Sequence, residues 1–259
     1  MPRDSVRQSA NLLAVVAALA VNVLAVTLPL NGQDTAAISD RFPIYFVPAG
    51  YVFSIWGLIY IGWIAFVIYQ FLPQHKENPR LRKLGYLFAL SCVFNAGWLF
   101  CWHYLQFGLS VVVMLILLAL LVASYVRLNV GRLQVGAAER WCVDIPFGAY
   151  LGWITVATVA NISDFLYSIG WNGFGIAGQT WAVLMLAVAC LLGLGMALTR
   201  RDAAYLLVLV WAFVGIASKQ SAAVMVATAA WVAAAFALLL AALSLVRGAG
   251  STRPSRAPA

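Results

Sequence analysis

The sequence predicts an all-α polytopic membrane protein with eight transmembrane helices, and three features of the chain carry this prediction. Of the 259 residues, 64% are hydrophobic and 9% are charged, whereas an average soluble domain is about a quarter charged. The apolar residues form long runs bounded by charged residues, proline, glycine or asparagine. The basic residues gather in alternate gaps between these runs. The composition excludes a soluble domain, because so few charged side chains cannot cover its surface.

Eight apolar runs approach the length of about 20 residues that a helix needs to cross the hydrocarbon core of a bilayer. They cover residues 10–30, 47–71, 84–106, 109–127, 143–166, 181–199, 203–218 and 222–246. The first run follows two arginines, as in a signal peptide, but it is longer and has no clear cleavage site, so we expect it to remain as a span. The last two runs would overshoot a bilayer as one helix, and we expect a tight hairpin at residues 218–221.

The basic residues predict the orientation of these spans. When successive loops are assigned to alternate sides of the membrane, one side receives 14 of the 16 Lys and Arg residues. Those on this side are Arg3, Arg7, Lys76, Arg80, Arg82, Lys83, Arg127, Arg132, Arg140, Arg200, Arg201, Arg247, Arg253 and Arg256. Because loops rich in basic residues stay in the cytoplasm, we expect a multi-pass protein of the cell membrane with both termini cytoplasmic. Residues 248–259 are rich in Gly, Ser, Pro and Arg and predict a disordered cytoplasmic tail.

The net charge of +8 does not indicate a nucleic-acid partner, because the basic residues lie in short loops between spans. The expected partners are the lipid bilayer and a small hydrophobic ligand. The four cysteines form no CxxC pair and no cluster with histidine, so we expect no metal site. Gly148 and Gly152 form a GxxxG motif, which predicts close helix packing and would also suit a homodimer face. Asp144 follows Arg140 by four residues, a spacing typical of an ion pair within one helix.

Three runs carry aromatic and polar residues along one helical face near the middle of the bilayer. The three stripes are Trp56, Tyr60 and Trp63; Ser91, Asn95, Trp98 and Trp102; and Tyr150, Trp153, Ala157, Asn161 and Asp164. Tryptophan and tyrosine usually lie at the membrane interfaces, and an amide in hydrocarbon is costly unless it is hydrogen-bonded. We therefore expect the stripes to face one another around an aromatic cavity. The alternative is a packed bundle in which Asn95 and Asn161 hydrogen-bond across helices.

Two outer loops, residues 31–46 and 164–180, are long enough to fold over the opening of such a cavity, and both carry aromatic residues. Ionisable residues near this side could line the mouth of the cavity. The candidates for the mouth are Arg41, His103, Asp164 and Lys219. The cationic side chains would pair with the propionates of a porphyrin, and His103 would approach an iron centre. The alternative is that these are loop residues in contact with water.

Three of the motifs resemble those of the translocator protein family, also called tryptophan-rich sensory proteins or peripheral benzodiazepine receptors. The segment PAGYVFSIWGLIY, residues 48–60, resembles the second helix of the family, with Tyr51 in the place of its first tryptophan. The segment FNAGW, residues 94–98, matches the third helix. Pro146, Trp153 and Asn161 resemble the pattern of the fifth helix, although three extra residues separate the proline from the tryptophan. The resemblance covers about residues 10–168.

This resemblance implies a five-helix core, residues 1–168, around a pocket for porphyrins, sterols or other flat hydrophobic molecules, with the first interhelical loop as a lid and a homodimer as the common assembly. Carried over from the family motifs, the ligand-binding candidates are Tyr51, Phe53, Trp56, Tyr60, Asn95, Trp98, Trp153, Ala157 and Asn161. Residues 169–247 would add three transmembrane helices that the family core lacks. No cofactor is required, and a porphyrin or haem would be the bound group.

The leading hypothesis is an integral membrane binding or sensory protein with an aromatic pocket for a tetrapyrrole or a similar flat hydrophobic ligand. A multi-pass transporter of small apolar solutes is the first alternative. A membrane enzyme that degrades porphyrin through the chemistry of the bound pigment is the second. The chain has no HExxH, GxSxG or P-loop motif and no paired carboxylates inside a run, so we assign no catalytic residue and do not expect an enzyme.

Overall fold

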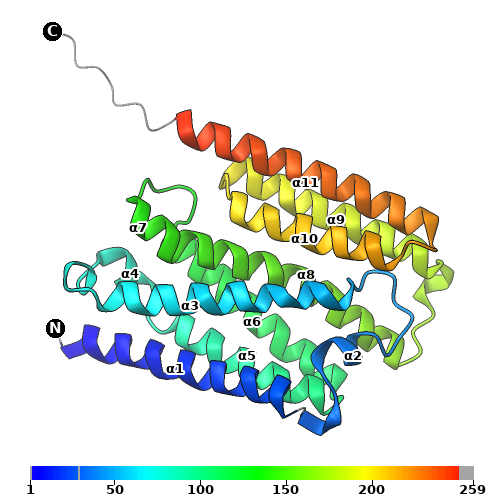
Figure 1. The fold of residues 1–259 in the computed structure, drawn as a ribbon, viewed down its shortest axis with the longest axis horizontal. Helices are drawn as coiled ribbons and strands as arrows, with labels where there is room; N and C mark the ends of the chain where they lie inside the picture. Colours follow the sequence, from blue (N-terminus) through cyan, green and yellow to red (C-terminus); the bar gives the residue numbers. More distant parts are fainter. Residues whose placement is uncertain (1, 29, 251–259) are drawn as a thin grey trace.

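A computed structural model describes residues 2–28 and 30–250, which form a bundle of eight long helices (Figure 1). The long helices are α1 (Pro2–Thr27), α3 (Ile55–Phe71), α5 (Leu87–His103), α6 (Phe107–Leu128), α8 (Ile145–Ser168), α9 (Gly178–Thr199), α10 (Ala203–Lys219) and α11 (Val224–Gly250). No strand occurs within these residues. The all-α prediction is confirmed, and one long helix corresponds to each of the eight apolar runs.

Six of the long helical segments have the length and apolar composition needed to cross a membrane. They are Asp4–Thr27, Gly50–Phe71, Phe107–Leu128, Ala137–Ser168, Gly178–Thr199 and Val224–Val246. The remaining two long helices, α5 and α10, are equally apolar in character but contain 17 residues each. The length and apolar composition of these helices therefore indicate a multi-pass membrane protein.

Short elements connect the long helices. They are α2 (Thr35–Ser39), α4 (Pro79–Leu84), α7 (Ala137–Glu139), a π-helical turn (Arg140–Asp144) that leads into α8, and four 3₁₀ turns at Leu30–Gly32, Gly50–Ser54, Pro73–His75 and Gly173–Gly175. The second expected span starts later than its apolar run, because Pro48 and the 3₁₀ turn precede α3. The hairpin expected at residues 218–221 is present between α10 and α11.

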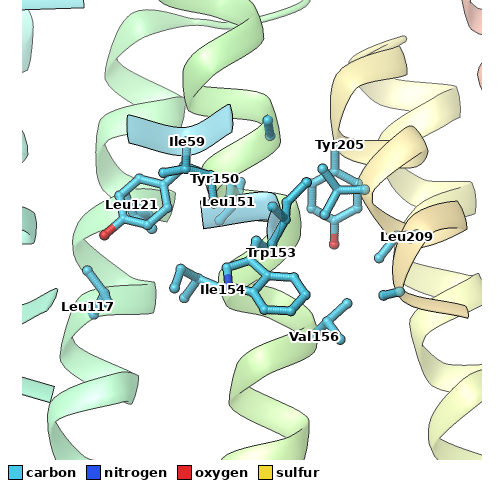
Figure 2. Packing of buried hydrophobic residues seen from close by; sticks show 14 of the residues in the cluster. Ile59, Leu117, Leu121, Tyr150, Leu151, Trp153, Ile154, Val156, Tyr205 and Leu209 are labelled. Carbon is cyan, nitrogen blue, oxygen red and sulfur yellow. The ribbon is translucent and has the colours of Figure 1, made fainter. Parts of the chain in front are cut away.

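Helix α8 lies at the centre of the bundle and packs against α3, α6 and α10. Figure 2 shows its side chains Tyr150, Trp153 and Ile154 between residues of α6 and residues of α10. On the remaining sides, α1 packs against α5, and α9 and α10 pack against α11. The three C-terminal helices thus form a layer that covers α8 on the side away from α1 (Figure 1).

The GxxxG motif allows α8 and α10 to approach each other closely. A Cβ atom added to Gly152 would lie 3.0 Å from the backbone oxygen of Tyr205, and one added to Gly148 would meet the carboxylate of Asp202. The close packing expected of this motif is confirmed, but both glycines are used inside one chain. The motif is therefore not available as a homodimer face.

The first residues of α1 and the last residues of α11 lie at the same end of the bundle (Figure 1). At this end, the buried guanidinium of Arg80 pairs with Glu139 at 2.9 Å and with Asp144, and its Nε donates to the backbone oxygen of Leu128. The hydrogen-bond partner of Asp144 thus comes from another helix, α4. The pair with Arg140 predicted from the i,i+4 spacing is wrong, because the π-helical turn changes the local helical repeat.

Helix α11 includes residues 248–250, which the composition had assigned to a disordered tail. Residues 251–259, the rest of that predicted tail, lie outside the described residues.

Candidate ligand-binding site

The three stripes predicted from the sequence meet around one cavity. Side chains of Trp56 from α3, Trp98 from α5 and Trp153 from α8 all line it. The full lining is Ser39, Pro48, Phe53, Trp56, Trp98, Trp102, Trp153, Val156, Ala157, Ala160, Asn161 and Asp164. We call it the tryptophan cavity. Its volume is about 30 Å³, roughly the space that one water molecule occupies.

The aromatic rings around the tryptophan cavity pack against one another. Trp98 stacks on Trp102 with ring centroids 5.5 Å apart and 23° between the planes. Trp153 makes edge-to-face contacts with Phe53 at 5.8 Å and with Trp56 at 6.3 Å. These separations lie in the range that favours aromatic pairs. The rings therefore hold one another in place and nearly fill the space between α3, α5 and α8.

A hydrogen-bonded chain fixes one wall of the cavity. The indole Nε1 of Trp98 donates to Oδ1 of Asn161 at 3.1 Å, and Nδ2 of Asn161 donates to Oγ of Ser110 at 2.8 Å. An indole can only donate, so this partner determines which way the amide of Asn161 points. The chain links α5, α8 and α6 through buried side chains.

Two polar groups in the lining lack hydrogen bonds. Asp164 is 0% exposed and neither of its carboxyl oxygens has a hydrogen-bond partner among the described residues. The indole Nε1 of Trp153, which is 2% exposed, is also without a partner. Buried polar groups in proteins are nearly always satisfied. Within the lining of the tryptophan cavity, a ligand or water molecule would meet both groups. Other buried polar atoms of the described chain, among them Nε1 of Trp63 and Oδ1 of Asn11, also lack a partner and lie outside this cavity.

Three of the predicted ligand-binding residues lie outside the lining. Asn95 and Tyr60 belong to a neighbouring polar cluster: Nδ2 of Asn22 donates to Oδ1 of Asn95 at 3.0 Å, and the Tyr60 hydroxyl donates to Oδ1 of Asn22. Sequence reasoning missed Asn22, although an asparagine within an apolar run was the signal that identified Asn95. Tyr51 is 49% exposed and contacts Trp211 edge to face.

The first loop, residues 30–54, lies at one end of the tryptophan cavity and contributes Ser39, Pro48 and Phe53 to its lining. We call this loop the lid. Its α2 helix begins at Asp34, whose carboxylate accepts hydrogen bonds from the backbone of Ala36 and Ala37 at 2.8 Å each. The lid predicted from the family resemblance therefore has a defined fold.

The lid is attached to α5 and α10. Trp102 donates to the backbone oxygen of Thr35 at 3.2 Å, and Trp211 donates to that of Val52 at 3.0 Å. The backbone of Ala49 also donates to Gly215 at 3.2 Å. These and further hydrogen bonds, one ion pair and the buried apolar side chains of the lid, such as Ile38 and Phe46, thus hold the lid over the cavity.

Two of the other expected mouth residues, His103 and Lys219, serve this attachment rather than the lining. His103 is fully buried; its Nδ1 lies 3.2 Å from the Leu30 carbonyl oxygen, and its Nε2 lies 3.0 Å from the Thr35 hydroxyl. The carbonyl can only accept, so Nδ1 donates and Nε2 accepts. Neither nitrogen is free to bind an iron. Lys219 forms an ion pair with Asp40 of the lid.

Arg41, also expected at the mouth, is exposed and hydrogen-bonds Gln33 within the lid at 3.3 Å. Among the described residues, no group of three His, Cys, Asp or Glu side chains could hold a metal ion.

A larger hollow lies on the other side of α8, and sequence reasoning did not locate it. Its volume is about 400 Å³. Its lining comes from the lid, α8, the loop before α9, and α9, and includes Tyr45, Tyr167, Trp171 and Trp181. We call it the outer crevice. Both outer loops that were expected to fold over an opening contribute to it, so that pattern was the available signal.

Two polar groups of the outer crevice are hydrogen-bonded to its own backbone. Trp181 donates to the backbone oxygen of Gly173 at 2.9 Å, and Asn172 accepts from the backbone of Phe174 at 3.0 Å. Trp171 contacts Trp181 with ring centroids 5.4 Å apart. None of the buried polar atoms that lack a partner among the described residues belongs to this lining, so the crevice is an apolar, aromatic surface.

Comparison with known proteins gives one family. The chain matches the model of the family described as TSPO-like protein over residues 8–243. This match extends from α1 to α11, beyond the residues that carry the motif resemblance. Searches of curated proteins and of solved structures return no match. Because the family model covers most of the chain, this multi-pass protein belongs to the TSPO-like protein family.

Proposed function

We propose that this protein is an integral membrane binding or sensory protein that takes a flat hydrophobic ligand, of the tetrapyrrole class or similar in shape, into the tryptophan cavity. The observation that carries the proposal is the convergence of Trp56, Trp98 and Trp153 from three helices on one cavity. Flat aromatic walls with a few polar groups suit a planar apolar ligand. Membership of the TSPO-like family agrees with this function.

Binding requires the cavity to open. A volume of about 30 Å³ is far below the roughly 300–1,000 Å³ of small-molecule sites. No macrocycle fits among the side chains as they lie. The lid contributes Ser39, Pro48 and Phe53 to the lining, and it is a connecting loop held to α5 and α10 by hydrogen bonds, one ion pair and buried apolar side chains. We therefore propose that the lid moves outward and the stacked indoles separate when a ligand enters.

The tryptophan cavity is preferred over the outer crevice for a physical reason. The crevice is large enough for a ligand, but none of the buried polar atoms that lack a partner among the described residues belongs to its lining. The cavity holds the unpartnered groups of Asp164 and Trp153. A bound ligand would remove this cost in the cavity and would remove none in the crevice.

Quenching of tryptophan fluorescence by protoporphyrin IX tests the proposal on the full chain in lipid nanodiscs. We expect saturable quenching. Substituting Trp98→Phe or Trp153→Phe should weaken affinity by about fivefold, because phenylalanine has a smaller ring and no N–H donor, a loss of about 1 kcal/mol. Trp231→Phe is the matched control, since Trp231 is 52% exposed on α11.

Two results would contradict the proposal. One is the absence of saturable quenching. The other is that both cavity variants bind protoporphyrin IX as tightly as the wild type does, while Trp181→Phe binds it more weakly. This result would assign binding to the outer crevice.

We also propose that all eight long helices cross the cell membrane and that both termini are cytoplasmic. The excess of basic residues at one end of the bundle supports this orientation. A five-helix core at residues 1–168, extended by three helices at 169–247, and a homodimer remain predictions.

A further inference from the structure

We propose that the tryptophan cavity selects ligands with a cationic tip, such as a protonated amine, and that Asp164 pairs with this tip. The inference rests on the proposed binding role of the cavity, but not on a tetrapyrrole being the ligand. It assigns the ligand a chemical class, a hydrophobic organic cation, and gives a role to a carboxyl group that nothing else in the fold uses.

The first argument is the environment of Asp164. The residue lies on α8, is 0% exposed and lines the cavity, yet neither carboxyl oxygen has a hydrogen-bond partner in the described chain. A buried carboxylate within a membrane protein is costly unless it is paired, and such residues mark substrate or ion sites. We therefore infer that the carboxylate of Asp164 pairs with a bound ligand and not with another side chain.

The charged side chains nearest to Asp164 do not serve as that partner. Lys219 and Asp40 are the charged groups that act on it electrostatically, and these two form an ion pair with each other. Lys219 donates to Asp40 at the partly exposed surface of the lid. Lys219, the basic side chain of the described residues whose charge acts on Asp164, is thus held by the lid.

The second argument is the chemistry of the walls. Four indoles line the cavity with Asp164: Trp56, Trp98, Trp102 and Trp153. The face of an aromatic ring carries partial negative charge, so rings around a carboxylate attract a cation and disfavour an anion. Aromatic cages of this kind recognise ammonium groups in other proteins. A ligand carboxylate placed beside Asp164 would be repelled.

The third argument is size. A space of about 30 Å³ holds a group as large as one water molecule, which is also the size of an ammonium group. The charged tip of a ligand fits beside Asp164 before any indole moves. The apolar body of the ligand then occupies the space that opens when the lid moves outward and the stacked indoles separate.

A pair of probes of nearly equal shape tests the inference. The probes are 2-naphthylmethylammonium and 2-naphthylmethanol, titrated calorimetrically into wild-type protein in nanodiscs, with empty nanodiscs as the reference. We expect the ammonium to bind at least about tenfold more tightly, the ratio that one charge-assisted hydrogen bond provides. Asp164→Asn should abolish this preference and change the affinity for the alcohol by less than about twofold.

Two further variants control for folding and for surface charge. Asp164→Glu keeps a carboxylate and should keep a preference for the ammonium, which a purely structural role of Asp164 does not predict. Glu77→Gln removes a carboxylate that is 58% exposed on the segment before α4, and should alter neither affinity by more than about twofold. If Asp164→Asn does not fold, Asp164→Ser replaces it.

Three results would overturn the inference: no binding of the ammonium probe, equal affinity for the two probes in the wild type, or an unchanged preference in Asp164→Asn. Protoporphyrin quenching that depends on Trp98, without a preference for the ammonium, would overturn this inference and leave the proposed function intact. A preference that depends on Asp164, without protoporphyrin binding, would support this inference and contradict the tetrapyrrole as the ligand.

Discussion

Three buried asparagines, Asn22, Asn95 and Asn161, make hydrogen bonds between helices in the apolar part of the bundle. Asn22 joins α1 to α3 and α5, while Asn161 joins α8 to α5 and α6. In a membrane, where apolar surface alone does not drive helices together, such bonds help to define which faces meet. These side chains thus determine the rotation of the helices that form the tryptophan cavity.

Replacing the buried Asn161 should lower the free energy of unfolding, because two interhelical hydrogen bonds are lost. Asn161→Leu removes the acceptor of the Trp98 indole and the donor to Ser110, which leaves buried groups unsatisfied, at a cost of about 1–3 kcal/mol in the free energy of unfolding. Ser163→Ala is the control, because its hydroxyl bonds only within α8, to Val159. Unfolding titrations in mixed micelles measure both. An Asn161→Leu variant as stable as Ser163→Ala would contradict this role.

The sequence predicted most of the residues that line the cavity, but it did not predict which partner each of them contacts. The periodicity of the three stripes placed Trp56, Trp98 and Trp153 on the correct faces, because helical spacing alone determines a face. It did not separate the lining from the polar cluster behind it, which holds Tyr60 and Asn95. That distinction depends on which helix lies opposite, and Asn22 on α1 is the opposing residue.

At the scale of elements, α8 organises the bundle through its two faces. One face carries Trp153, Asn161 and Asp164 toward the tryptophan cavity. The other carries Gly148 and Gly152, where α10 packs closely. The carboxylate of Asp202 lies at this crossing, caps α10 by accepting from the backbone of Ala204 and Tyr205, and accepts from the Tyr125 hydroxyl at 2.7 Å.

A methyl group at this crossing should destabilise the fold. Gly148→Ala would displace the Asp202 carboxylate from its three donors, and we expect a loss of about 1–3 kcal/mol in the free energy of unfolding. Gly57→Ala is the matched control, because a Cβ there meets nothing within 4 Å; it should be neutral or slightly stabilising, since alanine favours a helix. Equal stability of the two variants would mean that α8 and α10 are farther apart than described.

The packing of α9, α10 and α11 against α8 was not predictable from the apolar runs. A run of apolar residues gives the length of a helix but not its neighbour, because lipid and protein are equally apolar surroundings for leucine and alanine. The GxxxG motif indicated a close crossing and left its partner open. The partner is α10 of the same chain.

At the scale of the whole molecule, the sequence predicted the number and position of the long helices correctly. Burial of backbone polar groups in hydrocarbon leaves helices as the available spanning structure for such runs, so hydropathy is enough to locate them. The two hollows could not be predicted in the same way. Their volumes, about 30 Å³ and about 400 Å³, depend on how side chains of four or more segments fit together.

The orientation of the whole chain is open to a direct test. An even number of crossings with 14 basic residues on one side predicts that both termini are cytoplasmic. Green fluorescent protein fused to either terminus in a bacterial host should fluoresce, and alkaline phosphatase at the same positions should be inactive. A fusion to the loop at residues 169–177 should show the reverse. Opposite results at the two termini would mean an odd number of spans.

The central claim, that three converging tryptophans form the ligand site, is tested most directly by ¹⁹F NMR of protein labelled with fluorotryptophan. Single Trp→Phe substitutions assign the resonances of the ten tryptophans, and protoporphyrin IX is then titrated into nanodiscs. Ring currents of a bound macrocycle should shift the resonances of Trp56, Trp98 and Trp153 saturably and leave that of Trp231 in place. Shifts confined to Trp171 and Trp181, or no shift at any tryptophan, would contradict the claim.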